Sequence, residues 1–339
     1  MESSTLNEPY NESPVLDIAD VSVEYPTPSG RIQAVHHVTL SVRRGEVVGL
    51  VGESGCGKST LALASMRLLR HGATLSTGTV QVNGKDLYQM DPEELRRFRW
   101  THLAMVFQSA MNALNPVMTV RQQMLDTLRS HDDHPSKQKL EARIRDLLDL
   151  VRIDHRYLDS YPHELSGGMR QRVVIAMAVS LNPSVIILDE PTTALDVVVQ
   201  RSILDQIKAI QKDHNFAMLF ISHDIGLVRR LASTIYVMYA GRLVEINSTG
   251  GLLGLDGNHH PYTTGLLQAI PRLTADKVEI EGIPGSTPDL SDPPTGCSFH
   301  PRCPVVMDIC RVRSPSLTSV GGNQIACHQF AKSEEGLHG

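Results

Sequence analysis

The sequence predicts an α/β fold with a mainly parallel sheet, and three observations lead to it. An apolar strand at residues 47–51 runs directly into a glycine-rich loop and then into a helical pattern from Lys58. From residue 185 onward, apolar strands alternate with helical segments, at 185–188, 197–212, 217–221 and 234–239. Because parallel strands need crossover connections, this alternation favours a parallel sheet. The length of 339 residues indicates about two compact units.

A β-rich subdomain and a helical subdomain are expected around this core. Strands at 15–25 and 38–42 follow a polar leader at residues 1–14. Helical periods dominate between about 119 and 181, and one amphipathic face there collects Leu140, Ile144, Leu147, Leu148 and Val151. Beyond residue 247 the chain is rich in Gly, Pro, Asn and His, with one short helix expected at 261–270. We therefore expect a main domain at 15–247 and a small C-terminal appendix at 248–339.

Composition and charge exclude several classes of protein. With 41% hydrophobic and 20% charged residues, the chain has the composition of a globular protein and not of a disordered or fibrous one. A net charge of -5 provides no electrostatic footprint for wrapping nucleic acid. Residues 1–14 contain Glu but no Lys or Arg, so no signal peptide is expected. Apolar runs such as 173–181 are too short to span a bilayer, so any membrane role is expected to be peripheral.

The glycine-rich loop at residues 52–59 reads GESGCGKS and matches the phosphate-loop pattern G-x-x-x-x-G-K-[ST]. Its glycines let backbone N–H groups cradle phosphate oxygens, Lys58 would reach the β and γ phosphates, and Ser59 would bind Mg²⁺. A glycine turn without a ligand is the alternative, and the strand–loop–helix context argues against it. The sequence thus predicts an ATP or GTP site formed by Gly52, Glu53, Ser54, Gly55, Cys56, Gly57, Lys58, Ser59 and Thr60.

A second buried strand ends in two acidic residues, since residues 185–190 read VIILDE. Their carboxylates emerge at the carboxyl edge of the sheet, where ligands of such folds bind. Asp189 would hold Mg²⁺ through water, and Glu190 would accept a proton from the water that attacks the γ phosphate. An acidic helix cap is the alternative for a lone Asp, but a pair of acids after aliphatic residues favours the catalytic interpretation.

A third motif opens a long apolar helix and reads LSGGM, formed by Leu165, Ser166, Gly167, Gly168 and Met169. It resembles the LSGGQ signature of the ATP-binding-cassette (ABC) ATPases, with Met169 in place of Gln. The resemblance implies that Ser166 and the glycine N–H groups bind the γ phosphate held by the phosphate loop of another subunit, which suits a helix N-terminus. One chain carries one phosphate loop and one signature, so a second ATP-binding subunit is implied.

The remaining motifs of this family follow in order along the chain. Gln108 resembles the Q-loop residue that contacts Mg²⁺ and the lytic water, and His223 in ISHD resembles the switch histidine that contacts the γ phosphate. Tyr25 is similar to the aromatic residue that stacks on adenine, although a Tyr at a strand end can equally be a core or edge residue. The resemblance implies a P-loop NTPase core of ABC-ATPase type that hydrolyses ATP. The TALD sequence resembles the D-loop, with Ala194, Leu195 and Asp196.

Two C-terminal segments resemble one particular subfamily of the ABC ATPases. Residues 259–271 (HHPYTTGLLQAIP) and 297–304 (CSFHPRCP) are similar to the oligopeptide, dipeptide and nickel importers. In that subfamily the ATPase docks beneath two membrane permeases, usually beside a second ATPase, and an external binding protein delivers the substrate. The resemblance implies an ATPase on the cytoplasmic face of a bacterial membrane that energises the import of di- or oligopeptides, with 248–339 as a regulatory domain.

Three alternative functions compete with peptide import. Another solute, such as an oligosaccharide or nickel, is the alternative within this architecture, because substrate contacts lie on other subunits. A soluble ABC ATPase that acts on nucleic acid would be expected to carry two cassettes or a long coiled coil, and the sequence has neither. A P-loop kinase of small molecules leaves LSGGM and ISHD unexplained.

Four cysteines lie near the C-terminus, at Cys297, Cys303, Cys310 and Cys327. Their gaps exceed those of common zinc knuckles, but four thiolates suit tetrahedral ligation of zinc or of an iron–sulfur cubane. The resemblance implies a [4Fe–4S] cluster, which we rank before zinc and before free buried thiols. His300 and His328 are reserve ligands, although solvated surface residues are the more usual interpretation of such histidines. Because the segment has few periodic apolar positions, we expect the metal site to hold it in shape.

Cys56 lies inside the phosphate loop, where a small residue is needed, and we expect it to replace a serine there. A helix N-terminus also favours the thiolate form of a cysteine, so a reactive thiol is expected at this position.

Overall fold

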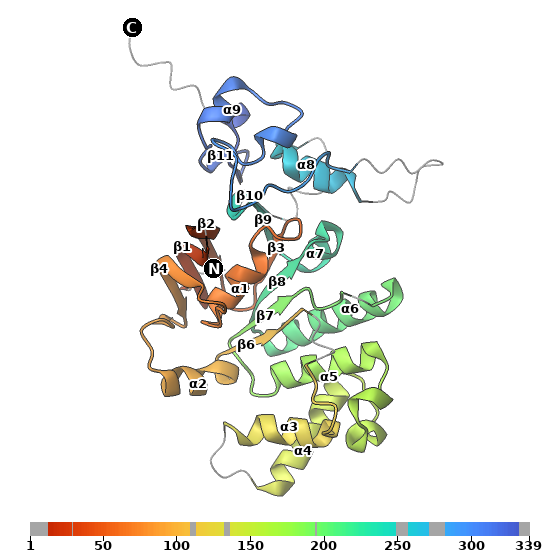
Figure 1. Cartoon of the computed structure of the whole chain (residues 1–339). Coiled ribbons are helices and arrows are strands. Elements are labelled where there is room, and N and C mark those ends of the chain that lie inside the picture. The colour runs from red at the N-terminus through yellow and green to blue at the C-terminus, as the bar shows by residue number, and fades with distance from the viewer. Residues whose placement is uncertain are drawn as a thin grey trace, which may run out of the picture.

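The computed structural model describes residues 13–28, 30–108, 113–131, 136–193, 195–248, 257–270 and 282–331. In these residues a central β-sheet lies between a helical subdomain and a C-terminal element, which comprises residues 257–270 and 282–331 (Figure 1). Most of the expected polar leader, and Ala194, lie outside the described residues. The expected α/β fold is confirmed.

The main sheet has the strand order β11-β12-β10-β9-β3-β8-β7-β6. Its central strands β9, β3, β8, β7 and β6 are parallel, whereas β10, β12 and β11 are joined to them by antiparallel pairing. The eight strands are β3 (Val47–Val51), β6 (Leu103–Val106), β7 (Val185–Asp189), β8 (Ala217–Ser222), β9 (Thr234–Tyr239), β10 (Arg242–Ser248), β11 (Thr318–Val320) and β12 (Asn323–Ile325).

A smaller antiparallel sheet, in the order β2-β1-β4-β5, packs beside the main one. The sequence predicts two separate strands in this part of the chain, at 15–25 and 38–42. In the structure β1 and β2 instead form one continuous hairpin, which is paired as far as Thr27 and Gly30. The intervening residues extend the hairpin because their backbone groups pair across it. Its strands are β1 (Leu16–Thr27), β2 (Gly30–Val42), β4 (Thr74–Val82) and β5 (Lys85–Asp86).

Alternate residues of the buried strands divide the core between the two faces of the main sheet. In β7, Val185 and Ile187 join the cluster that includes the small sheet, whereas Ile186 and Leu188 join the cluster formed with the helices. Both faces are therefore apolar, as expected for a parallel sheet covered on both sides. Burying one such side chain contributes roughly 1.5–3 kcal/mol.

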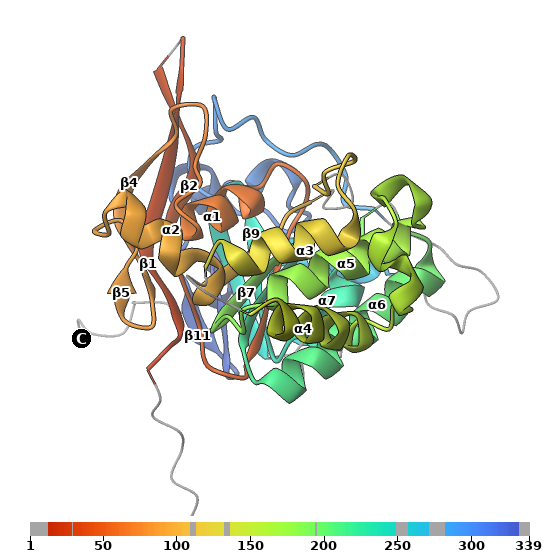
Figure 2. The ribbon, with the colours of Figure 1, turned by 90° about the horizontal axis from the view of Figure 1, so that it is seen from below.

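Most of the helices cover the main sheet or build the helical subdomain below it (Figures 1 and 2), whereas α8 (Pro261–Gln268) and α9 (Asp308–Val312) belong to the C-terminal element. In the region expected to be helical, α3, α4 and α5 pack on one another, and α3 and α4 also pack on the short turn at His155–Asp159. No described helix has the length and apolarity needed to traverse a lipid bilayer. The helices are α1 (Lys58–Ser65), α2 (Pro92–Thr101), α3 (Val120–Arg129), α4 (Lys137–Leu150), α5 (Gly167–Val179), α6 (Val197–His214), α7 (Ile225–Leu231), α8 (Pro261–Gln268) and α9 (Asp308–Val312).

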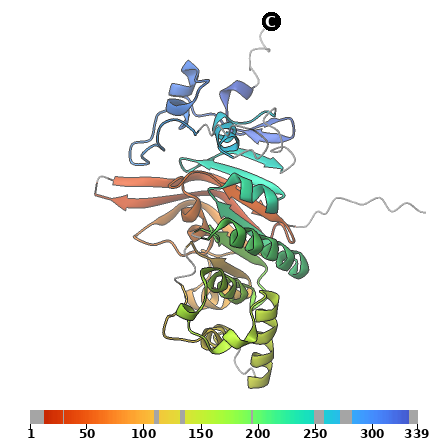
Figure 3. The same cartoon turned by 90° about the vertical axis from the view of Figure 1, so that its right-hand side faces the viewer.

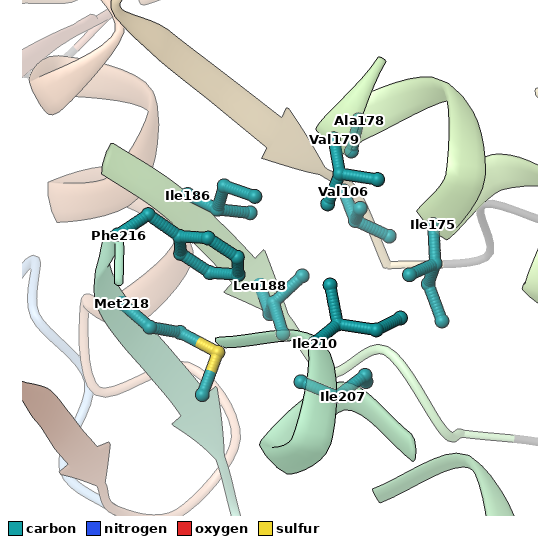
Figure 4. Close-up of a pocket in the computed structure, with 10 residues that line it drawn as sticks. All are labelled: Val106, Ile175, Ala178, Val179, Ile186, Leu188, Ile207, Ile210, Phe216 and Met218. Carbon is teal, nitrogen blue, oxygen red and sulfur yellow. The ribbon is translucent and has the colours of Figure 1, made fainter. Parts of the chain in front are cut away.

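A small void of about 10 Å³ lies where α5 and α6 meet the sheet (Figure 4). It is lined by apolar side chains, among them Ile175, Leu188, Ile207 and Phe216. Because an ordered water needs polar partners, this void is a feature of packing and not a binding site.

The C-terminal element lies at the opposite end of the molecule from the helical subdomain (Figure 3). It extends the main sheet, because Ile325 and Gln324 of β12 pair with Glu245 and Ile246 of β10. Phe299, which is 2% exposed, packs against Tyr239 at the end of β9 and against Tyr262 in α8. The element therefore has an apolar anchor on the core as well as the four cysteines.

Candidate nucleotide-binding and catalytic site

The carboxyl ends of β3, β6, β7 and β8 meet at one edge of the main sheet, because these strands are parallel. The phosphate loop follows β3, Gln108 follows β6, Glu190 follows β7 and His223 follows β8. Together they border a cavity of about 550 Å³. It is lined by Ala34, Glu53, Ser54, Gly55, Gly57, Lys58, Ser59, Thr60, Gln108, Glu190, Thr193 and His223.

The phosphate loop has a conformation that only glycine tolerates at its critical position. Gly57 has a φ of 106°, and a Cβ atom there would lie 2.4 Å from the carbonyl oxygen of Ala34. This explains the glycine immediately before Lys58, where the loop turns into α1. Ala34 comes from the β2 hairpin, and no motif in the sequence indicates that it borders the site.

Lys58 is held inside the loop by backbone oxygens. Its Nζ donates to the carbonyl oxygens of Gly52, at 2.7 Å, and Glu53, at 2.8 Å. The side chain is 4% exposed. None of its hydrogen-bond partners, the two carbonyl oxygens and the more distant Cys56 sulfur, is a carboxylate, so the buried ammonium group keeps its charge available to an anion in the cavity.

Asp189 has the surroundings expected of a cation ligand. Its Oδ1 has no hydrogen-bond partner among the described residues, although the side chain is buried. Burial raises the pKa of Asp189, and a hydrogen bond from Ser59 opposes that rise. An orphaned carboxylate oxygen beside a hydroxyl is the oxygen donor set that a hard divalent cation takes, so Asp189 and Ser59 fit Mg²⁺.

Glu190 is held from three sides. Gln108 Nε2 and Thr193 Oγ1 each donate to Glu190 Oε2 at 3.1 Å, and His223 Nδ1 lies 3.1 Å from Glu190 Oε1. The structure therefore brings together Gln108, His223 and Glu190, three of the residues that the sequence places at the site. Thr193 as a partner of Glu190 was missed, because a threonine in a turn carries no distinctive sequence signal.

The backbone of Glu190 is also constrained. Its φ of 47° lies in the left-handed region, which costs about 1–3 kcal/mol for a residue other than glycine. The N–H of Glu190 donates to the carbonyl oxygen of Ile221 in β8, at 2.9 Å, and this bond stabilises the turn. The turn directs the carboxylate into the cavity, next to the end of β8.

The LSGGM motif forms the start of α5, as its residue types predict. Ser166 is the N-cap, and its Oγ accepts from the N–H of Met169 at 3.3 Å. Gly168 lies against α6, since a Cβ atom there would lie 2.7 Å from Val199 Cγ1. Asp196 caps α6 by accepting from the N–H of Val199, at 2.8 Å. Among the described residues that line the cavity, none belongs to the motif at 165–169.

Tyr25 and Cys56 lie at the margin of the site. The Tyr25 hydroxyl is 3.4 Å from Thr60 Oγ1. Cys56 is 2% exposed, with its sulfur 3.7 Å from Lys58 Nζ. Burial raises the pKa of Cys56 and outweighs the opposite effect of Lys58. The expectation of a reactive thiolate is therefore wrong, and Cys56 has the surroundings of a small packing residue.

The four C-terminal cysteines are free thiols that lie within electrostatic reach of one another. Burial, and to a smaller extent the other three thiols, raises the pKa of Cys327 to about 11. Yet among the described residues no three His, Cys, Asp or Glu side chains form a group that could hold a metal ion. The structure thus lends no support to the expected [4Fe–4S] cluster or to the zinc alternative.

Comparison with known proteins decides the family. A family model described as "ABC transporter" matches residues 35–193, and one described as "Oligopeptide/dipeptide transporter, C-terminal region" matches residues 244–310. The chain is 40% identical over 324 residues to the dipeptide transport ATP-binding protein DppD of Caldanaerobacter subterraneus subsp. tengcongensis, covering 95% of this chain and 98% of that protein. This chain belongs to the ATP-binding proteins of ABC transporters. It is an ATPase of that family.

Further similar proteins support the assignment of this chain to the ABC ATPases. It is 42% identical over 325 residues to the probable D,D-dipeptide transport ATP-binding protein DdpD of Escherichia coli K12, covering 95% of this chain and 98% of that protein. Among solved structures, it resembles a dimeric ATP-binding cassette in a post-hydrolysis state bound to ADP and Pi. That match has a TM-score of 0.62 and 26% identity, and it covers 69% of this chain and 98% of the other.

Proposed function

We propose that this ABC ATPase hydrolyses ATP to energise the import of di- or oligopeptides through a membrane transporter. The observation that carries the proposal is the similarity, over 91% or more of the chain, to proteins named for dipeptide transport or peptide import. The match of residues 244–310 to the C-terminal region of oligopeptide and dipeptide transporters supports it. Import of another solute, such as an oligosaccharide or nickel, is the alternative.

In this proposal, each residue around the cavity has its own role in ATP hydrolysis. Lys58 and the N–H groups of the phosphate loop bind the phosphates, and Asp189 and Ser59 hold Mg²⁺, with Gln108 beside them. Bound Mg²⁺ neutralises charge on the phosphates. Glu190 accepts the proton of the attacking water, and its contacts with Gln108, Thr193 and His223 keep the carboxylate oriented for that transfer. Tyr25 stacks on adenine.

The partners belong to the same proposal. The ATPase associates peripherally with the cytoplasmic face of a bacterial membrane, beneath two permease subunits, and an extracytoplasmic binding protein supplies the substrate. A second ATP-binding subunit completes each site, because the signature residues of this chain do not line its own cavity. Ser166, at the N-cap of α5, would then face the γ phosphate of the partner. With a net charge of -5, nucleic acid is not proposed as a partner.

For the C-terminal cysteines we propose a metal site that stabilises the element, with a [4Fe–4S] cluster ranked before zinc. What supports it is that all four cysteines are free thiols, two of them buried, in a segment of short strands and turns. Burial, and to a smaller extent the neighbouring thiols, raises the pKa of Cys297, Cys303 and Cys327, and binding of a cation would favour their thiolate forms. This site takes no part in hydrolysis.

Glu190→Gln should reduce ATP hydrolysis at least about 100-fold, because the amide keeps the shape of the side chain but accepts no proton. In proteoliposomes that contain the assembled transporter, dipeptide uptake should fall with phosphate release, while MgATP still binds. Glu94→Gln, an exposed change in α2, is the matched control. Undiminished hydrolysis at this chain's site would show that Glu190 is not the base. If the wild-type transporter takes up dipeptide equally well with and without ATP, the proposal of ATP-driven peptide import is wrong.

Ser166→Arg should lower hydrolysis at the partner's phosphate loop by about 100-fold, because a bulky cation replaces the cap of α5 that faces the γ phosphate. The measurement is phosphate release by the assembled pair, with the partner carrying the intact loop. Ser316→Arg, in an exposed C-terminal turn, is the control. Full activity of a verified monomer at all concentrations would contradict the shared site.

Purified without oxygen, the chain should carry about four iron and four sulfide per molecule. Cys303→Ser should lose most of that iron and make residues 282–331 more sensitive to proteolysis. A colourless protein with one zinc would replace the cluster with the zinc alternative. If the protein holds no metal and the variant resists proteolysis like the wild type, the proposed metal site is wrong.

A further inference from the structure

The C-terminal element reaches back to the phosphate loop through one arginine. Arg302 Nη1 and Nη2 donate to the two carboxylate oxygens of Glu53, at 2.7 and 3.0 Å. The residues are 249 positions apart, and the element lies directly beyond the loop that follows β3 (Figure 1). A two-point contact between planar groups fixes orientation as well as distance.

Arg302 is itself held rigidly. Its Nε donates to the carbonyl oxygen of Pro284 at 2.8 Å, and its guanidinium lies 5.8 Å from the centre of the Tyr239 ring. The side chain of Arg302 in this ion pair is 6% exposed, against 27% for Glu53. The short turn His300–Arg302 that carries it begins after Phe299, which packs on the core, and ends at Cys303. Arg302 is therefore presented to the loop by a fixed support.

Glu53 is held at its backbone as well. Its N–H donates to the hydroxyl of Tyr262 in α8, at 2.7 Å, and Tyr262 is fully buried. The carbonyl oxygen of Glu53 accepts from Lys58 Nζ. The C-terminal element thus supplies two of the groups that fix Glu53, and the residue borders the nucleotide cavity.

We propose that Arg302 is a positioning residue for ATP, which orders the phosphate loop in its binding conformation by holding Glu53. The loop needs an outside support because its glycines leave it conformationally free. Without the contact, the loop must be ordered when the nucleotide binds, and this entropy cost weakens binding. Removal of Arg302 also leaves an unpaired carboxylate beside the bound phosphates. This role goes beyond the proposed function and is independent of the transported solute.

The test is the affinity of the purified full-length chain for MgATP, measured by isothermal titration calorimetry. Arg302→Met should raise Kd about tenfold, which corresponds to about 1.4 kcal/mol. Arg302→Lys, which retains the charge but not the two-point geometry, should give an intermediate value. Arg311→Met, the same change at an exposed position of the same element, should leave Kd within twofold of the wild type.

A double-mutant cycle assigns the effect to the pair. Glu53→Met should also weaken binding about tenfold, and the double variant should lose about tenfold and not a hundredfold, because both changes break one contact. In the assembled transporter, Arg302→Met should raise the KM for ATP and leave kcat nearly unchanged, because Glu190 and its partners are not altered. A merely structural role would lower the thermal midpoint of unfolding without this shift in KM.

Two results would overturn the proposal. One is an Arg302→Met variant that remains folded and binds MgATP within twofold of the wild type. The other is additive loss in the double variant, which would show that Arg302 and Glu53 act separately. If Arg302→Met does not fold, the Kd values of Arg302→Lys and Glu53→Met for MgATP serve as the test, and values within twofold of the wild type overturn the proposal. Because these affinities are measured on the purified chain without any transported solute, failure of this proposal leaves peptide import untouched.

Discussion

The parallel alignment of β3, β6, β7 and β8 is the constraint on which the site depends. Parallel strands end at the same edge, so a loop after each strand contributes to one cavity. The phosphate loop, Gln108, Glu190 and His223 are thereby assembled from four distant segments of the chain. The alignment is maintained by apolar side chains that alternate between two buried faces, and a one-residue slip in any strand would move each side chain into the opposite cluster and displace the loop that follows the strand.

Charge is distributed around this edge in a way that suits polyphosphate. Lys58 is a buried cation held by carbonyl oxygens, whereas the neighbouring carboxylates each have a defined environment. Asp189 has an orphaned oxygen beside Ser59, Glu190 is held by three side chains, and Glu53 is neutralised by Arg302. An acidic residue at a phosphate site would ordinarily repel the ligand. Here each carboxylate has a cation, a hydrogen-bond donor or room for a metal ion.

Short-range patterns predicted most of the residues that line the site, but not Ala34, and they could not predict long-range contacts. The phosphate loop and the VIILDE strand are recognisable because each motif occurs in the local context that it requires. The contacts of Gly57 with Ala34 and of Glu53 with Arg302 depend on tertiary packing, which no local pattern encodes. Cys56 is instructive, because its position at a helix N-terminus favours a thiolate, yet burial raises its pKa. The pairing of β12 with β10 could not be predicted either, because the two strands lie far apart in sequence.

The most direct test of the central claim is the binding of MgATP to the chain with and without the buried cation of its phosphate loop. Calorimetry of the wild type should give one site per chain, with tighter binding in the presence of Mg²⁺ than with EDTA. Lys58→Ala should abolish that site, because it removes the cation that binds the phosphates, and the variant should still unfold cooperatively on heating. Equal affinity in Lys58→Ala and the wild type, or no dependence on Mg²⁺, would contradict the assignment of this edge of the sheet as the nucleotide site.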